Sequence, residues 1–192
     1  IRHAAQRFTA VYERYLTDSK VYMAVIPDKG QYLAGKSGHL SLDFEQLNGI
    51  LMEETPWATH INLYDTLKES DYYRTDTHWR QEQLLDTAGR LCEAMGARVP
   101  KWEDYTVTAL EQPFYGVYYG QAALPMEPET ICLLENEMLN QCRVYDYETG
   151  KYGQVYDRTK LDSRDLYDVY LSGAKSLLTI ENPNSASDRE LI

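Results

Sequence analysis

Helical and β-prone segments alternate along the first 65 residues, and this order limits the fold more than any other feature of the chain. Residues 4–16 and 41–56 carry apolar side chains at spacings of three and four, which predicts two amphipathic helices. Residues 20–27 and 57–65 are short and rich in β-branched and aromatic residues, which predicts a strand after each helix. The order helix, strand, helix, strand favours a parallel sheet covered by helices.

Local signals refine the two helices. Ser41 or Asp43 can cap the second helix at its N-terminus, and Pro56 ends it. The first helix presents one apolar stripe that we expect to pack against a neighbour. This stripe consists of Ala4, Phe8, Val11, Tyr12 and Tyr15.

The character of the chain changes after residue 100. Residues 80–96 predict a third amphipathic helix that ends at Gly96. Short β-prone runs separated by turn residues follow, and residues 148–150 form the expected tip of a β-hairpin. The predicted strands lie within residues 106–110, 115–120, 129–134, 141–147, 151–157, 167–173, 176–182 and 189–192, the last returning to the main sheet. We therefore expect an α/β fold in one domain, residues 1–192, with a β-rich insertion at residues 101–160.

Charge and composition exclude several classes of partner. The net charge of −11, from 30 acidic and 19 basic residues, disfavours contact with nucleic acids and anionic lipid surfaces. No stretch approaches the roughly 20 apolar residues of a membrane helix, so we expect no direct membrane insertion. Cys92, Cys132 and Cys142 are too few for a disulfide framework, and we expect free thiols, although Cys132 and Cys142 could pair across a hairpin.

The run YYRTDTHW at residues 72–79 places a carboxylate and an imidazole two positions apart, just before the third predicted helix. Side chains at i and i+2 diverge on a helix but project from one face of an extended segment. A carboxylate beside His78 would fix its tautomer and stabilise the imidazolium while the ring takes a proton from a hydroxyl group. Asp76 and His78 are therefore candidate catalytic residues, and Thr75 and Trp79 are candidates for supporting positions around them.

Two other interpretations of this pair stay open. In the first, Asp76 caps the following helix and His78 is a half-exposed loop histidine. In the second, His60 or His39 joins Asp76 and His78 as a further metal ligand. Because His60 lies in a predicted strand, where a structural histidine is more common, we predict neither a metal nor a cofactor.

The run at residues 72–79, followed by an amphipathic helix, resembles the signature of DHHW-family proteins. It also resembles the alginate O-acetyltransferase-like members of the SGNH hydrolase superfamily. Asp76, His78 and Trp79 match both patterns, whereas Thr77 departs from Asp-His-His-Trp and agrees with the Asp-Thr-His-Trp form of the second. Residues 21–33 resemble the first strand and proline turn of these proteins, and residues 167–183 resemble the segment before the nucleophile strand.

The resemblance implies a three-layer α/β/α, flavodoxin-like fold in which the Asp-x-His pair precedes the serine of a Ser-His-Asp triad. The serine is expected after the next strand, beyond residue 192, because Ser185 and Ser187 lie in a turn-rich stretch. The chain begins without methionine and stops where an apolar run starts. We therefore expect a fragment, inactive by itself, of a longer serine-dependent enzyme.

The implied activity is O-acetyl transfer or ester hydrolysis on an extracytoplasmic bacterial polysaccharide. The implied partners are a polysaccharide or acetylated sugar as substrate and a membrane-bound acyl donor. No oxyanion-hole donor can be assigned from the sequence. Gly116, Gly120 and Gly173 permit a close backbone approach, which tight turns also require.

The 17 tyrosines support a function from another class. They gather in residues 113–121 and 143–157. Flat aromatic rings with a polar tip suit sugar rings, although tyrosines also line half-buried strands. The alternative is therefore a non-catalytic carbohydrate-binding or assembly module with a hydrolase-like fold.

Overall fold

The computed structural model describes residues 1–123, 125–185, 187 and 189–192. The chain divides into two compact units, which are described separately. Unit 1 comprises Ile1–Glu69 and Asp86–Val99, and unit 2 comprises Ser70–Leu85 and Pro100–Ile192. The expectation of one domain with an insertion at residues 101–160 stays a prediction.

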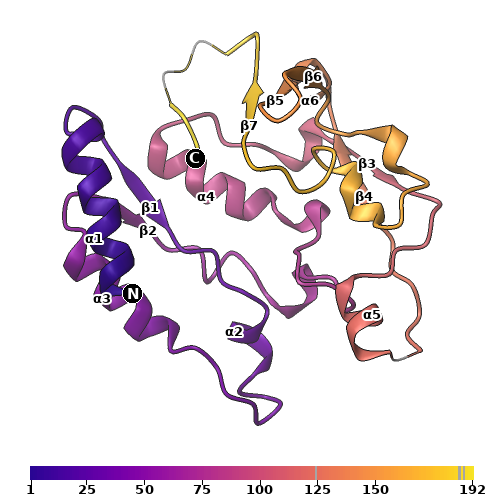
Figure 1. Cartoon of the computed structure of the whole chain (residues 1–192), viewed down its shortest axis with the longest axis horizontal. Coiled ribbons are helices and arrows are strands. Elements are labelled where there is room, and N and C mark those ends of the chain that lie inside the picture. The colour runs from indigo at the N-terminus through magenta and orange to yellow at the C-terminus, as the bar shows by residue number, and fades with distance from the viewer. Residues whose placement is uncertain (124, 186, 188) are drawn as a thin grey trace. The chain divides into compact units, whose positions relative to one another are not determined.

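Unit 1 contains a parallel pair of strands and the helices beside it. Its elements are α1 (Arg2–Val11) with a π-helical extension (Tyr12–Leu16), β1 (Tyr22–Ala24), α2 (Gly30–Leu33), α3 (Phe44–Glu54), β2 (Thr59–Ile61) and most of α4 (Leu85–Met95). β1 and β2 pair in parallel, with Tyr22 opposite Thr59 and Ala24 opposite Ile61. α1 contacts α3, and both lie beside the strand pair (Figure 1). The predicted order of helix, strand, helix and strand is confirmed.

Capping residues set the helix boundaries as their chemistry requires. The carboxylate of Asp43 accepts a hydrogen bond of 2.8 Å from the backbone N–H of Gln46, which caps α3. Gly96 follows α4 with a φ of 65°, a conformation that glycine adopts without strain. Both boundaries agree with the sequence.

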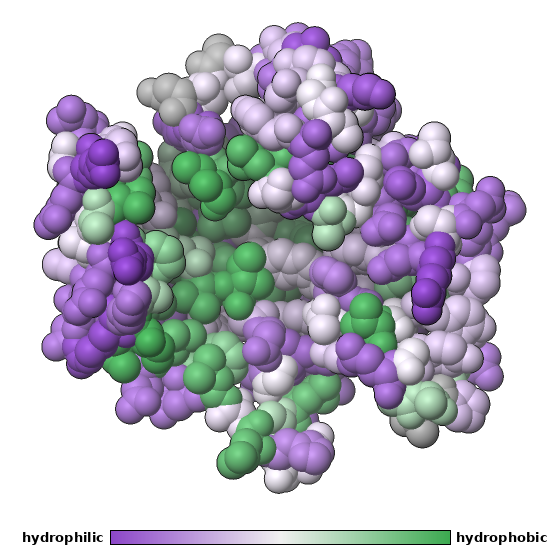
Figure 2. Space-filling model, viewed as in Figure 1, coloured by the Kyte–Doolittle hydropathy of each residue, from purple (hydrophilic) through white to green (hydrophobic). Residues whose placement is uncertain are grey.

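The predicted apolar stripe on α1 is wrong except at Tyr12. Ala5 is the buried residue of this helix, and its small side chain permits close contact with a neighbour. Tyr12 stacks on Trp57 with 4.4 Å between ring centroids, and the indole N–H of Trp57 donates to the hydroxyl of Thr9. These contacts turn the helix away from the predicted face. Phe8, Val11 and Tyr15 consequently remain exposed. Figure 2 shows one face of the molecule, on which hydrophobic and hydrophilic side chains are interspersed.

Unit 2 is built on two small antiparallel sheets. Its strands and helices are β3 (Thr106–Ala109), α5 (Val117–Ala122), β4 (Cys132–Glu135), α6 (Glu137–Gln141), β5 (Arg143–Asp146), β6 (Lys151–Gly153) and β7 (Leu178–Glu181). β3 pairs with β4, and the other sheet has the order β6-β5-β7. Short 3-10 helices span Glu69–Asp71, Gln81–Gln83, Trp102–Asp104, Arg158–Lys160 and Leu166–Val169.

Three of the predicted strands are wrong. Residues 115–120 contribute to helix α5, residues 167–173 begin in the 3-10 helix Leu166–Val169, and residues 189–192 form no strand. The strand predicted within residues 176–182 is confirmed as β7, which pairs antiparallel with β5. Over the described residues the fold is thus mixed α/β with small sheets, because tertiary hydrogen bonds override β propensity in these segments.

The predicted hairpin is confirmed. β5 and β6 pair antiparallel up to Asp146 and Lys151, and Gly150 in the connecting turn has a φ of 67°. The side chain of Asp146 accepts a hydrogen bond from the backbone N–H of Glu148, which stabilises the turn.

An aromatic and aliphatic core fills unit 2. It consists of Tyr73, Leu110, Phe114, Ile131, Leu133, Tyr156, Leu166 and Val169. All three cysteines are free thiols, as expected, and Cys142 is buried. Within the described residues, no helix is long and apolar enough to cross a membrane.

Candidate active site

The segment that carries Asp76 and His78 is a closed loop of unit 2. Tyr72 and Trp79 form an isolated antiparallel bridge across its ends. The backbone N–H of Tyr73 donates to the carbonyl of His78 over 3.0 Å. The expectation of an extended segment is therefore wrong, because these cross-loop bonds bend residues 72–79 back on themselves.

The loop nevertheless brings the acid and the imidazole together. Oδ1 of Asp76 accepts a hydrogen bond of 3.0 Å from the backbone N–H of His78, an Asx turn, and also contacts Nδ1 of the His78 ring. The Asp76 side chain is only 2% exposed, whereas that of His78 is 48% exposed. The Nδ1 edge of the imidazole thus contacts a buried carboxylate, while the rest of the ring remains accessible.

The electrostatics of the pair follow from this contact. Burial alone would raise the pKa of Asp76, but hydrogen bonds from the side chain and backbone of His78 and from the backbone of Val117 lower it to about 2. The hydrogen bond to Asp76 raises the pKa of His78 more than burial lowers it, and the charge of Asp165 acts in the same direction. Asp76 is therefore ionised at neutral pH, and it favours the protonated form of the imidazole.

A second anchor comes from the start of α5. The backbone N–H of Val117 donates to Oδ2 of Asp76 over 2.8 Å, and that of Tyr118 donates to the carbonyl of Thr75 over 2.9 Å. Asp76 thus accepts from the start of α5, whereas the next helix along the chain, Gln81–Gln83, has Arg80 at its N-cap. The interpretation of Asp76 as a cap of the following helix is wrong, whereas His78 is indeed a half-exposed loop histidine.

Glu129 fixes the base of the loop from a distant part of the sequence. Its carboxylate accepts three hydrogen bonds, from the backbone N–H groups of Arg74 and Thr75 and from the hydroxyl of Thr75, over 2.8, 2.6 and 2.7 Å. The same hydroxyl of Thr75, which is fully buried, accepts from the backbone N–H of Gly116. Thr75 therefore connects Glu129, the loop and α5.

Replacing Glu129 with alanine is expected to lower the free energy of unfolding by about 2 to 3 kcal/mol, because three donors lose a charged acceptor. Urea denaturation of both proteins measures the difference. The matched control is Glu127→Ala, since Glu127 is an exposed glutamate that accepts a hydrogen bond from Arg74 through its backbone carbonyl, which alanine retains. Equal losses in the two variants would contradict the role assigned to the carboxylate of Glu129.

Tyr167 supports the imidazole from its other side. The rings of His78 and Tyr167 stack with 4.0 Å between centroids and 17° between planes. Burial, together with the charges of Asp76 and Asp165, raises the pKa of the Tyr167 phenol to about 12, so the ring is neutral. Tyr167 in turn contacts Tyr73 and Phe114 of the core. The plane of His78 is thus fixed by stacking as well as by its bond to Asp76.

The metal interpretation has no counterpart in the geometry. Nε2 of His60 lies 3.0 Å from the hydroxyl of Thr55 in unit 1, which is the contact of a structural histidine. Over residues 1–123, 125–185, 187 and 189–192, no three side chains of His, Cys, Asp or Glu are grouped to hold a metal ion.

Comparison with solved structures places this site in a known fold. The chain superimposes on a DHHW family protein from Eubacterium siraeum with a TM-score of 0.77 and 19% identity, over 96% of this chain. The chain has the fold of a DHHW family protein. It also matches Bacillus cereus PatB1 at 18% identity, with TM-scores of 0.69 for the structure with a sulfonyl adduct and 0.61 for another, each over 96% of this chain. No protein-family model and no curated protein sequence matches it.

The expected likeness of the chain to DHHW-family proteins is thus confirmed at the level of the fold. The chain spans 65% of the length of the E. siraeum protein and 67% of that of PatB1. At such low identity the likeness to the DHHW protein establishes the architecture alone, and the catalytic roles of Asp76 and His78 stay predictions. The supporting roles of Thr75 and Trp79 do so too, although both residues hold the loop in place.

The sequence did not indicate three residues that contribute to this site. Glu129 and Tyr167 lie far along the chain from residues 72–79, and only tertiary structure brings them near. The N–H of Val117 was missed because its segment has β propensity and was predicted as a strand. One local signal was present, because Asp165 precedes Tyr167 by two residues and caps its 3-10 helix.

Proposed function

We propose that the parent protein is a serine-dependent O-acetyltransferase or acetylesterase that acts on an extracytoplasmic polysaccharide. The observation that carries this proposal is the contact of a buried, ionised Asp76 with Nδ1 of a half-exposed His78. In a Ser-His-Asp triad this is the arrangement that leaves Nε2 available as the general base. The nucleophile is a serine beyond residue 192. The β1–β2 pair belongs to the larger parallel sheet of a three-layer α/β/α fold in the parent.

Each residue has a defined task in the reaction. Nε2 of His78 takes the proton of the serine hydroxyl while the serine oxygen attacks the ester carbonyl. Asp76 stabilises the imidazolium that forms, and stacking on Tyr167 keeps the imidazole ring in its orientation. The imidazolium then returns the proton to the leaving group, which is the sugar oxygen of an acetylated sugar or the carrier of the acyl donor, and an acyl-serine remains. Water or another sugar hydroxyl attacks the acyl-serine, giving acetate or an acetylated acceptor.

Two comparisons support this chemistry. The chain shares its fold with PatB1, of which one structure contains a sulfonyl adduct, and sulfonyl reagents react with activated nucleophilic side chains. The net charge of −11 fits a neutral substrate better than a phosphate-rich one. A membrane-bound acyl donor and a location outside the cytoplasm complete the proposal.

A non-catalytic carbohydrate-binding module is the second candidate. Tyr147 and Tyr152, on the hairpin of β5 and β6, are 54% and 53% exposed. Both rings pack against Tyr145, with centroid distances of 4.8 and 5.0 Å. Exposed, mutually supported aromatic rings favour a binding surface and require no nucleophile.

Labelling with a fluorophosphonate separates the two candidates. We expect one serine of the parent protein, beyond residue 192, to be phosphonylated with loss of fluoride, and peptide mass spectrometry to locate it. His78→Ala should abolish the labelling, because the serine then lacks its base. His39→Ala is the matched control, since His39 is an exposed histidine of unit 1, and it should label normally.

Folded parent protein that takes up no label would contradict the serine mechanism and favour the binding module. Equal labelling of the wild type and a correctly folded His78→Ala variant would contradict the role of His78. Circular dichroism spectra of each variant establish that the fold is intact.

A further inference from the structure

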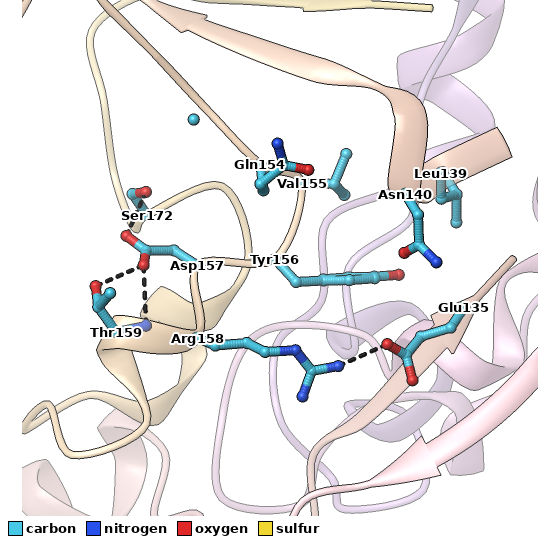
Figure 3. Close-up of a pocket in the computed structure, with 11 residues that line it drawn as sticks. Glu135, Leu139, Asn140, Gln154, Val155, Tyr156, Asp157, Arg158, Thr159 and Ser172 are labelled. Atoms are coloured by element: carbon cyan, nitrogen blue, oxygen red, sulfur yellow. Dashed lines mark hydrogen bonds and ion pairs between the residues drawn. The ribbon is translucent and has the colours of Figure 1, made fainter. Parts of the chain in front are cut away.

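Unit 2 contains a concave site that the proposed chemistry does not use. A pocket of about 600 Å³ lies where β4, α6 and the segment after β6 meet (Figure 3). Its volume falls within the range of pockets that hold small ligands. Its lining combines polar and apolar side chains, with Asn140, Gln154, Tyr156, Asp157 and Arg158 among them.

Two carboxamides of the pocket are free to bind a ligand. The side chains of Asn140 and Gln154 line it, and within the described part of the chain neither makes a side-chain hydrogen bond. Each carboxamide offers two donors and one acceptor. Apolar surface from Leu139 and Val155 lies beside them. A ligand that suits this lining presents hydroxyl groups at its edge and C–H groups on its faces.

The charged groups of the pocket already have partners. Arg158 contacts Glu135 over 2.6 Å. Asp157 accepts hydrogen bonds from the hydroxyls of Ser172 and Thr159, over 2.7 and 2.5 Å, and these contacts lower its pKa. Two carboxylates against one guanidinium leave no positive charge for an anion, so the pocket favours a neutral ligand.

The rim of the pocket has a strained backbone. Leu171, Ser172 and Gly173 have consecutive φ values of 55°, 64° and 85°, and only the third is a glycine. The bond from Ser172 to Asp157 holds this conformation. Strain of this kind persists where the surroundings fix it, and it gathers at ligand sites.

The same rim segment leads directly to His78. Tyr156, on the pocket wall, forms an antiparallel bridge with Tyr170, and the backbone N–H of Asp157 donates to the carbonyl of Val169 over 2.7 Å. Tyr170 packs against Tyr167 with 4.8 Å between centroids, and Tyr167 stacks on His78. The pocket and the imidazole are thus supported by one short run of chain, within one unit.

We propose that this pocket binds one neutral sugar residue of the polymer whose ester is processed at His78. This inference rests on the proposed function, since it assumes that a glycan is the substrate. Asn140 and Gln154 hydrogen bond to the sugar hydroxyls, and the apolar wall contacts the sugar ring. The pocket thereby positions a chain whose acetylated residue lies at the imidazole.

The test uses chitohexaose, cellohexaose and xylohexaose as neutral probes and hexagalacturonate as an anionic one. We expect at least one neutral hexaose to shift the side-chain NH₂ resonances of Asn140 and Gln154 in NMR titrations of the parent protein. In the double variant Asn140→Ala/Gln154→Ala, its Kd should rise about tenfold, as expected for lost hydrogen bonds. Gln6→Ala, which removes an exposed carboxamide of α1, is the matched control and should bind normally.

Hydrolysis of 4-nitrophenyl acetate should be unchanged in Gln6→Ala, because this residue lies on the exposed surface of α1. No binding of any neutral hexaose, undiminished binding by the double variant, or tighter binding of hexagalacturonate would each overturn the inference. If the wild type bound a neutral hexaose but did not hydrolyse 4-nitrophenyl acetate, the proposed function would be contradicted and the pocket assignment would stand.

Discussion

Replacing Asp76 with asparagine is expected to lower kcat for ester hydrolysis by the parent protein by about 10⁴-fold. The carboxamide nearly preserves the shape of the side chain, but its charge is lost and its NH₂ group can occupy the position that faces Nδ1. The imidazolium then loses its stabilising charge, and the ring can adopt the tautomer that protonates Nε2. Steady-state kinetics with 4-nitrophenyl acetate measures the loss.

The pH dependence distinguishes this mechanism from a general loss of structure. Because Asp76 raises the pKa of His78 above 6.5, wild-type kcat/KM should increase with pH through that raised pKa, as the base becomes neutral. In Asp76→Asn the increase of the residual kcat/KM with pH should begin at a lower pH, since Asp76 no longer raises the pKa of His78. An unchanged acidic limb would contradict the electrostatic role of Asp76.

Asp65→Asn is the matched control. Asp65 also has a lowered pKa, through its hydrogen bond with Arg90 in unit 1, but it lies outside the loop. Its replacement should leave both kcat and the pH profile unchanged. A comparable loss of activity in Asp65→Asn would show that the effect of Asp76→Asn is not specific to the site.

Asp76 also links stability to pH. Its pKa is lowered from 3.8 to about 2, so its ionised form stabilises the folded state by about 2 kcal/mol above pH 3.8. This contribution is lost as the pH falls through about 2. The raised pKa of His78 acts in the opposite sense: its contribution is complete below 6.5 and is lost as the pH rises through the raised value.

The parts of the fold that the sequence predicted correctly are those set by local chemistry. The capping of α3 by Asp43, the end of α4 at Gly96 and the turn at Gly150 each depend on residues within a few positions of one another. The closeness of Asp76 and His78 is local as well, because an Asx turn needs only two intervening peptide bonds.

The features that the sequence did not predict depend on contacts between residues far apart in the chain. The segment that contains α5 is rich in tyrosine, and it is helical because the loop at Thr75 and Asp76 accepts the N–H groups of its first turn. Glu129 contributes to the site through three bonds to the backbone and side chain of residues 74 and 75. No periodicity in the sequence records such pairings.

Replacing Gly116 with alanine is expected to damage both the fold and the site. An added Cβ would lie closer than 3.0 Å to the carbonyl oxygen of Thr75 and to the Cβ of Asp76, distances that real Cβ atoms essentially never show. Because the obstruction includes backbone, residues 116 and 117 must move, and the 2.8 Å bond from Val117 to Asp76 is lost. We expect a loss of about 3 kcal/mol in the free energy of unfolding, and at least about 10²-fold in kcat because the pair is displaced.

Gly120→Ala tests whether this loss comes from position or from removing any glycine of the region. Gly120 lies within α5, and an added Cβ there meets nothing within 4 Å. Alanine should therefore stabilise the helix by about 0.5 to 1 kcal/mol and leave kcat unchanged. Urea denaturation and ester hydrolysis of the two variants give the comparison. If Gly116→Ala were as stable and active as Gly120→Ala, the loop would not need the close approach of residue 116, and the anchoring of Asp76 by α5 would be wrong.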